Sequence, residues 1–166
     1  MTNDQALVIE PLASTHNRPS FSCGNDSLDN YLRAQARQDI KRRVSRAFVA
    51  IDAEQPDKIL GYYTLSSLAI DLSQLPLALA RKLPKHRIPA ALIGRLAVDE
   101  RAQGFGVGRM LLMDALNRTL TVSQEIAIFV MVVDAIDKQA EAFYRQFGFS
   151  ALGTEGRRLF LPLKSI

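Results

Sequence analysis

The sequence predicts a single domain in which strands alternate with helices. Its 166 residues are enough for one domain of ordinary size and too few for two. Hydrophobic residues make up 48% of the chain and charged residues 23%, which is typical of a globular protein with a buried core. Short β-rich runs are interspersed with segments whose apolar residues recur at helical spacing. We therefore expect residues 1–166 to form one domain of mixed α/β class.

The first half of the chain predicts a strand, a helix and a β-hairpin. The helix is indicated by apolar side chains at helical spacing and by Asn25 or Asp26, either of which can cap its first N–H groups. The hairpin is indicated by two β-rich runs on either side of a turn that contains Pro56 and Asp57. The expected elements are a strand at 7–12, a helix that includes Leu28, Tyr31, Leu32, Ala36 and Ile40, and hairpin strands at 47–51 and 59–70.

The second half predicts further strands and helices in alternation. A glycine-rich turn at 101–108 separates a buried strand from a helix, and Gly148 is expected near the C-cap of the last helix. Pro84 and Pro89 are expected to stop regular structure on the two sides of a basic loop. The expected elements are short helix 75–83, strand 91–98, helix 107–120, strand 126–133, helix 138–147, and short strands 149–152 and 159–163.

The sequence argues against a membrane protein, a secreted protein and a metalloprotein. The longest apolar run, 126–133, is far shorter than the ~18 residues that cross a bilayer, and the first residues lack the pattern of a signal peptide. We therefore expect a cytoplasmic protein. Cys23 is the one cysteine, so no internal disulfide can form. With only His16 and His86 besides, no metal-ligand spacing is present and we expect no metal.

Positive charge is concentrated in two short segments. The net charge is +4, yet residues 31–46 contain six Lys or Arg against one Asp, and residues 81–87 contain four more. Arg33, Arg37 and Lys41 follow one another at intervals of four, so their like charges repel along one helix face unless an anion offsets them. A polyanion such as a nucleic acid would do so, although a solvated helix face is an alternative that the charges alone leave open.

The most informative segment runs from Arg101 to Gly108, between a predicted strand and a predicted helix. Its three glycines let backbone N–H groups approach one anion, and a helix N-terminus adds partial positive charge. A tight turn that needs positive φ is the alternative. The segment is not a Walker loop, because Arg109 and Met110 follow the last glycine. A dinucleotide fold is disfavoured because the loop follows about four predicted strands instead of the first.

These residues resemble the GNAT acetyltransferase superfamily, and within it the acetyltransferase toxins of bacterial toxin–antitoxin pairs. The Q-x-x-G-x-G loop of the superfamily matches Gln103, Gly106 and Gly108. The resemblance implies a GNAT fold with a splayed, mostly antiparallel central sheet flanked by helices. It also implies acetyl-CoA as acetyl donor and the α-amino group of aminoacyl-tRNA as acceptor, so that the product blocks translation. Further matches lie at 23–36, 59–65, 94–99, 143–149 and 159–162.

The resemblance also implies roles for individual residues. Tyr144 is expected to protonate the leaving thiolate, since a phenol with a pKa near ~10 is a neutral proton donor at pH 7. An ordinary helix tyrosine packed on the sheet is the alternative. Phe105 replaces a residue that is often polar or basic in the family, so phosphate contacts there are expected from the backbone. The residues expected to bind acetyl-CoA are Leu96, Ala97, Val98, Gln103, Gly104, Phe105, Gly106, Val107, Gly108, Arg109 and Phe143.

Neither histidine has a clear place as general base, and none is required. An α-amino group titrates near ~7.7 to 8.0, so an appreciable fraction is already neutral and nucleophilic at pH 7. The basic segments are expected to contact tRNA phosphates. Arg95 is expected to reach either the substrate or a structural carboxylate. The residues expected to bind tRNA are Arg33, Arg37, Lys41, Arg42, Lys82, Lys85 and Arg95.

The expected partners are aminoacyl-tRNA, a small antitoxin of ribbon-helix-helix type and a second copy of the chain in a homodimer, all implied by the resemblance. Two other functions are compatible with the sequence. One is a GNAT enzyme that acetylates a small-molecule amine or a protein N-terminus. The other is a noncatalytic module that binds acyl-CoA or nucleic acid and turns nothing over.

Overall fold

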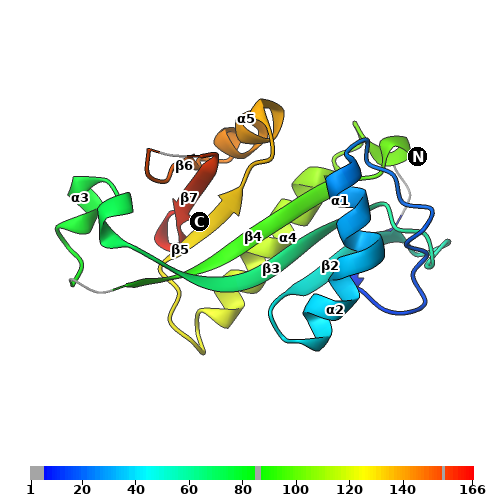
Figure 1. The fold of residues 1–166 in the computed structure, drawn as a ribbon, viewed down its shortest axis with the longest axis horizontal. Helices are drawn as coiled ribbons and strands as arrows, with labels where there is room; N and C mark the ends of the chain where they lie inside the picture. Colours follow the sequence, from blue (N-terminus) through cyan, green and yellow to red (C-terminus); the bar gives the residue numbers. More distant parts are fainter. Residues whose placement is uncertain (1–5, 85–86, 155) are drawn as a thin grey trace. The chain divides into compact units, whose positions relative to one another are not determined.

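The computed structural model describes residues 6–84, 87–154 and 156–166. Strands of the described chain form one sheet in the order β1-β2-β3-β4-β5-β7-β6 (Figure 1). The β4–β5 pair is parallel, whereas β1–β2, β2–β3, β5–β7 and β6–β7 are antiparallel. This mixed, mostly antiparallel architecture confirms the predicted fold class. The strands are β1 (Leu7–Pro11), β2 (Arg46–Asp52), β3 (Gly61–Ile70), β4 (Ile88–Val98), β5 (Val130–Asp134), β6 (Ser150–Ala151) and β7 (Arg158–Pro162).

Helices connect most of these strands. The described chain forms two compact units. The first unit contains the chain up to Ser66 together with Arg95–Ala115, and the second contains Ser67–Gly94 and Leu116–Ile166. No helix within the described ranges is long and apolar enough to cross a membrane. The α-helices are α1 (Asp26–Asn30), α2 (Ala36–Lys41), α3 (Leu77–Ala80), α4 (Val107–Val122) and α5 (Lys138–Gln146), with a π-helical turn at Tyr31–Gln35 and 3-10 turns at Leu72–Gln74, Glu100–Ala102 and Leu163–Ser165.

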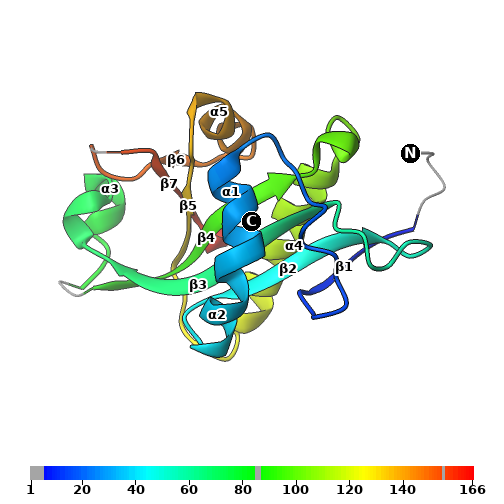
Figure 2. The same ribbon diagram turned by 45° about the vertical axis from the view of Figure 1, so that its right-hand side comes forward.

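In the first unit, helices cover both faces of the β2–β3 hairpin, because alternate side chains of a strand point to opposite faces. Figures 1 and 2 show α1 and α2 on one face and α4 on the other. On the α1 side, Tyr62 donates a hydrogen bond of 2.6 Å to the Leu28 carbonyl. On the α4 side, Tyr63 stacks on Phe48 and donates a hydrogen bond of 2.6 Å to Asp114. The core on the α1 side comprises Phe21, Leu28, Tyr31, Leu32, Ala36, Val49, Ile51, Ile59, Tyr62 and Ala97.

The predicted first helix is present, but a π-helical turn interrupts it. Asn25 caps the helix as expected, its side chain accepting from the Leu28 N–H. The N–H of Ala36 then bonds to the carbonyl of Tyr31, an i to i+5 bond that takes one residue more than an α-turn. The wider turn brings Ala36 to the buried side with Tyr31 and Leu32. The spacing of apolar residues predicted the helix, and Asn25 predicted its cap, but neither predicted this extra residue.

In the second unit, β4, β5, β7 and β6 pack around an apolar core. The parallel register joins Ala90–Ile93 of β4 to Val130–Val133 of β5. Helix α5 is capped by Asp137, whose side chain accepts from the Ala140 N–H. It ends before Gly148, whose φ of 93° confirms the predicted left-handed residue. The core comprises Ile70, Leu75, Ile88, Ala90, Val130, Val132, Leu152 and Phe160.

Three predicted boundaries in the second unit were wrong. Pro89 lies inside β4, as its second residue, where a proline can begin a strand because no ladder N–H is required of it. The run 126–133 becomes a strand only from Val130; Ile126 instead donates its N–H to Val122 at the end of α4, and is 63% exposed. The predicted helix 75–83 shrinks to α3, since Pro76 has extended ψ and the helix begins after it.

Candidate active site

The glycine-rich loop joins β4 to α4 in the first unit. Gly104 and Gly106 have φ of 84° and 83°, which confirms that the loop needs left-handed residues. A Cβ built on either glycine would meet no atom within 4 Å, and both residues are exposed. The backbone there is therefore open to an incoming group. Because α4 begins at Val107, its first N–H groups and the positive end of its dipole lie at the same place.

Gln103 braces this loop with its side chain. Its amide nitrogen donates to the carbonyl of Cys23 at 3.1 Å and to the carbonyl of Val98 at 3.0 Å. The side chain is thus engaged within the protein, so Gln103 can offer a phosphate its backbone N–H only. Gln103, the glutamine of the Q-x-x-G-x-G motif, therefore links the loop to the segment before α1.

Asp99 is a second brace, which the sequence reasoning did not identify. Its buried carboxylate accepts hydrogen bonds from the backbone N–H groups of Ser22 and Arg101 and from the Arg101 guanidinium. Burial acts to raise the pKa of Asp99, but these hydrogen bonds and the Arg101 charge outweigh it and leave the pKa below its usual range. An Asp at this position can indicate the N-cap of the short 3-10 turn, but it does not indicate the hydrogen bond from Ser22.

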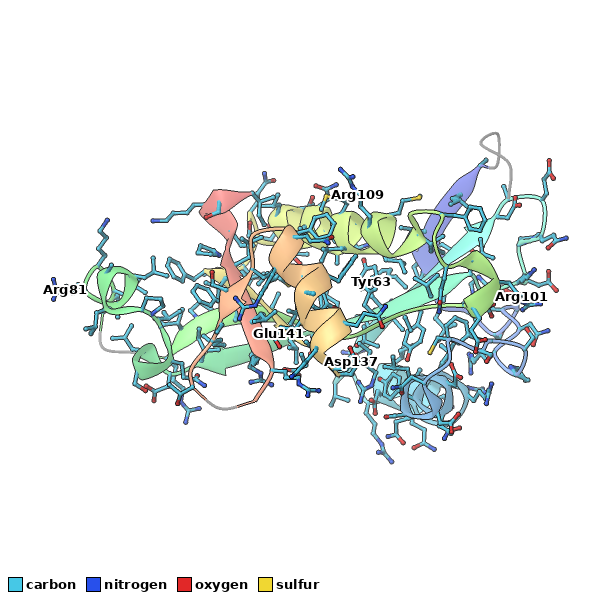
Figure 3. All side chains as sticks on the ribbon, turned by 90° about the horizontal axis from the view of Figure 1, so that it is seen from above. Tyr63, Arg81, Arg101, Arg109, Asp137 and Glu141 are labelled. Atoms are coloured by element: carbon cyan, nitrogen blue, oxygen red, sulfur yellow. The ribbon has the colours of Figure 1, made fainter. Side chains whose placement is uncertain are left out.

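Two further hydrogen bonds connect the segment before α1 to the residues before the glycine loop. The Glu100 N–H donates to the Ser22 carbonyl at 2.8 Å, and the Ser22 hydroxyl donates to the Glu100 carboxylate at 3.3 Å. Figure 3 shows Arg101 at this end of the first unit. These hydrogen bonds therefore tie the segment leading into α1 to the residues before the glycine loop.

Leu96, Ala97 and Val98 form the last part of β4. The parallel pairing with β5 ends at Ile93, so it includes none of these three residues. Ala97 is buried, while Leu96 and Val98 are half-buried. Gly61 of β3 permits the close packing here, because a Cβ on it would lie 2.9 Å from the Ala97 carbonyl oxygen and 2.9 Å from Leu111.

The remaining predicted cofactor residues of the first unit differ in exposure. Phe105 is 54% exposed at the tip of the glycine loop. The Val107 side chain is buried, so only its backbone is available to a ligand. Arg109 is exposed on the first turn of α4 and projects from the helix in Figure 3. Gly108 is half-buried inside the same turn.

Tyr144 and Phe143 lie on α5, in the second unit. The Tyr144 ring is only 3% exposed and contacts the rings of Phe143 and Phe149, with centroids 5.3 and 5.6 Å away. Among the described residues its hydroxyl makes no hydrogen bond. Burial, reinforced by the negative charge of Asp134, raises the pKa of Tyr144 well above its usual value. It is a neutral phenol with an available O–H.

The predicted tRNA-binding residues fall in both units. Arg37, Lys41 and Arg42 are exposed, and none of them forms an ion pair with a described residue. Arg33 is also exposed, but its guanidinium donates to the Phe21 carbonyl at 2.6 Å and so helps to hold the helix. Lys82 is exposed in the second unit. Lys85, like His86, lies outside the described residues.

Arg95 packs on an aromatic ring of the first helix. Its guanidinium carbon lies 3.5 Å from the centroid of the Tyr31 ring, a cation–π contact on the α1 side of β4. Tyr31 in turn donates its O–H to Asp39 at 2.8 Å. Burial, and then the hydrogen bond to Asp39, raise the pKa of Tyr31 to about 12. Arg95 remains half-exposed, so its charge can still act on a ligand.

The residues of the two units offer different chemical groups. Within the described parts of the chain no group of three or more His, Cys, Asp or Glu side chains could hold a metal ion. The first unit offers backbone donors for an anion and an adjoining cationic helix, and the second offers a proton donor.

Comparison with known proteins decides the family. Residues 43–151 match the model of the acetyltransferase (GNAT) domain. The chain belongs to the GNAT acetyltransferase family. This GNAT chain is 35% identical to a tRNA-acetylating toxin of Mycobacterium tuberculosis over 145 residues, which is 87% of this chain and 85% of the relative. It is 32% identical to a probable toxin TacT of Sinorhizobium fredii, over 96% of this chain and 92% of the relative.

Solved structures agree with this assignment. The GNAT chain resembles AtaT complexed with acetyl-methionyl-tRNAfMet, with a TM-score of 0.89, 30% identity and 96% of each chain covered. It also resembles AtaTR bound with AcCoA, with a TM-score of 0.85, 31% identity, and 98% of this chain and 96% of that chain covered. The predicted GNAT fold is thereby confirmed.

Proposed function

We propose that this GNAT acetyltransferase is the toxin of a type II toxin–antitoxin system. It transfers the acetyl group of acetyl-CoA to the α-amino group of aminoacyl-tRNA and so blocks translation. The observation that carries the proposal is the similarity, over 87% of the chain, to a protein named tRNA-acetylating toxin. The exposed cations of the first helix support it, because a tRNA presents a dense row of phosphates.

Acetyl-CoA is held by the first unit and supplies an acetyl group already activated as a thioester. Backbone N–H groups of Gln103, Gly104, Phe105, Gly106, Val107 and Gly108 surround the pyrophosphate, and Arg109 adds a cation. The fit rests on the two glycines whose Cβ positions are empty. Backbone groups of Leu96, Ala97 and Val98 hold the pantetheine and the acetyl carbonyl, since β5 does not pair with them. Phe143 contributes apolar contact from α5.

Proton transfer rests on Tyr144. Its O–H donates a proton to the sulfur as the C–S bond breaks and the new N–C bond forms, and the phenolate then regains a proton from solvent. The α-amino group reacts in its neutral form, so its excess proton is released to water after the attack. A lysine side chain, with a pKa near ~10.4, would be almost wholly protonated at pH 7, which favours an α-amine as acceptor.

The cations orient the tRNA. Arg37, Lys41 and Arg42 contact phosphates of the acceptor stem, with Arg33 beside them, and Arg95 faces the end of the substrate nearest to Leu96. Lys82 and Lys85, of the second basic segment, are proposed as further tRNA-binding residues. Arg33 has a second, structural role through its bond to Phe21.

Further proposals concern the domain organisation, the cellular location and the partners of the protein. Residues 1–166 act as one GNAT domain. The protein works in the cytoplasm, where charged tRNA is found, as a homodimer. A small ribbon-helix-helix antitoxin neutralises it, in keeping with the relative named as a probable toxin.

A cell-free translation assay tests the proposed function. Added together with acetyl-CoA, the protein should stop synthesis of a reporter, because acetylated aminoacyl-tRNA has lost the amine that forms the next peptide bond. Added alone to an extract depleted of acetyl-CoA, it should leave synthesis intact. Inhibition that is equal with and without acetyl-CoA would contradict the proposal, since simple capture of tRNA would then suffice.

A further inference from the structure

Arg43 adopts a left-handed backbone conformation at the end of the basic helix. Its φ is 60°, and it is the one residue other than glycine with positive φ in the described chain. The N–H of Arg43 bonds to the Ile40 carbonyl and the N–H of Val44 to the Asp39 carbonyl, each at 3.1 Å. These two bonds form a Schellman motif with Arg43 at the position that glycine normally occupies.

No side-chain contact within the described residues accounts for an arginine there. A side chain with a Cβ is disfavoured in this conformation. Arg43 is exposed, and its side chain makes no hydrogen bond or ion pair with the described residues. Asp39, the carboxylate of the same helix, is engaged by Tyr31 and Gln35. The helix C-terminus favours a cation, but Lys41 and Arg42 already supply that charge.

The surroundings of Arg43 are cationic. Lys41, Arg42 and Arg46 are all exposed and all carry the same charge, so that Arg43 adds repulsion as well as backbone strain. Val44 beside it is 59% exposed, so the turn is not covered by packing. A residue kept in a strained conformation, with an unpaired charge at the surface, is best explained by a ligand of opposite charge.

We propose that Arg43 is a phosphate-binding residue, and that the left-handed turn serves to present its guanidinium to the backbone of the bound RNA. This inference rests on the proposed function, because the RNA is the aminoacyl-tRNA of that proposal. Arginine suits the contact because its planar guanidinium can bind two phosphate oxygens at once. The strain of the turn is then offset only in the complex.

Three variants at this position and one elsewhere test the inference. Arg43→Gly and Arg43→Asn remove the charge while fitting the left-handed turn, and Arg43→Lys keeps both charge and strain. Lys164→Gln removes one exposed charge from the C-terminal end. For each protein, the thermal midpoint, the affinity for acetyl-CoA and the affinity for bulk charged tRNA at several salt concentrations are measured.

Arg43→Gly and Arg43→Asn should bind tRNA several-fold more weakly, with a salt dependence (log K against log salt) less steep by about 0.7 to 0.9. Their thermal midpoints should be unchanged or higher, and acetyl-CoA affinity unchanged. Arg43→Lys should keep most of the tRNA affinity, and Lys164→Gln should match the wild type throughout. Wild-type tRNA affinity in Arg43→Gly, or a lower thermal midpoint, would overturn the inference, because Arg43 would then be either idle or structural.

The same data separate this inference from the proposed function. If the wild type binds tRNA but acetylates none, and Arg43→Gly weakens that binding, the RNA contact stands and the proposed reaction fails. If the wild type binds no tRNA, both fail.

Discussion

Replacing Tyr144 by Phe is expected to lower kcat by roughly 10²- to 10⁴-fold, the usual contribution of a positioned general acid. Affinity for acetyl-CoA and the thermal midpoint should stay near wild-type values, because Phe preserves the ring contacts with Phe143 and Phe149 and no hydrogen bond within the described residues is lost. Steady-state kinetics, calorimetric binding and thermal unfolding provide the three readouts.

Tyr62→Phe is the matched control. It also deletes one buried hydroxyl, but that hydroxyl bonds to the Leu28 carbonyl. We expect it to cost about 1 kcal/mol of stability and to leave kcat nearly unchanged. A Tyr144→Phe enzyme with wild-type kcat would remove Tyr144 from the mechanism and leave it as a packing residue of α5.

The pH dependence of the reaction follows from the same residue. Burial raises the pKa of Tyr144 above its usual ~10, so the phenol keeps its proton throughout the neutral and moderately alkaline range. The rate should therefore rise with pH as the substrate α-amino group loses its proton near ~7.7 to 8.0, and then stay level. A fall in rate between those values and pH 10 would mean that a group of lower pKa donates the proton.

A triple substitution of Arg37, Lys41 and Arg42 by Gln is expected to weaken tRNA binding on the order of 10²-fold at moderate salt. The slope of log K against log salt should decrease by about 2 to 3, near one unit for each lost phosphate contact. Acetyl-CoA affinity should not change, because within the described residues these side chains form no hydrogen bond or ion pair with the glycine-rich loop. Arg33 is left intact because its bond to Phe21 supports the fold.

The control for that experiment removes three exposed or half-exposed charges elsewhere, at Lys58, Lys138 and Lys164. It changes the net charge equally, so a general effect of charge on RNA affinity would appear in both proteins. Equal weakening in the two would contradict a localised basic surface. A loss of acetyl-CoA affinity in the triple variant would indicate damage to the first unit.

Sequence patterns predicted those features of the fold that depend on residues close together in the chain. The β2–β3 hairpin, the cap at Asn25 and the left-handed residue Gly148 need only strand propensity, a side-chain acceptor and a missing Cβ. The residue at which β5 begins and the π-helical turn depend instead on neighbouring elements. Ile126 reads as strand by composition, yet its N–H completes α4.

In the candidate site, too, the sequence predicted features set by nearby residues and missed those set by tertiary packing. The glycine loop could be found because its three glycines lie close together in the sequence, at positions 104, 106 and 108. The braces at Gln103 and Asp99 could not, since their partners Cys23 and Ser22 are about eighty residues away in sequence and meet them only through tertiary packing. The Arg95 contact with Tyr31 likewise requires β4 and the first helix to lie side by side. For Arg43, the decisive fact is a backbone angle, which no residue pattern reveals.

The most direct test of the account is transfer of labelled acetyl from acetyl-CoA to bulk charged tRNA, with deacylated tRNA as the parallel substrate. The account predicts label on charged tRNA alone, released by mild alkali as an N-acetyl amino acid because the acetyl group sits on the α-amine of an ester-linked residue. Tight binding of acetyl-CoA without label on any tRNA would contradict it, and so would label that appears equally on deacylated tRNA.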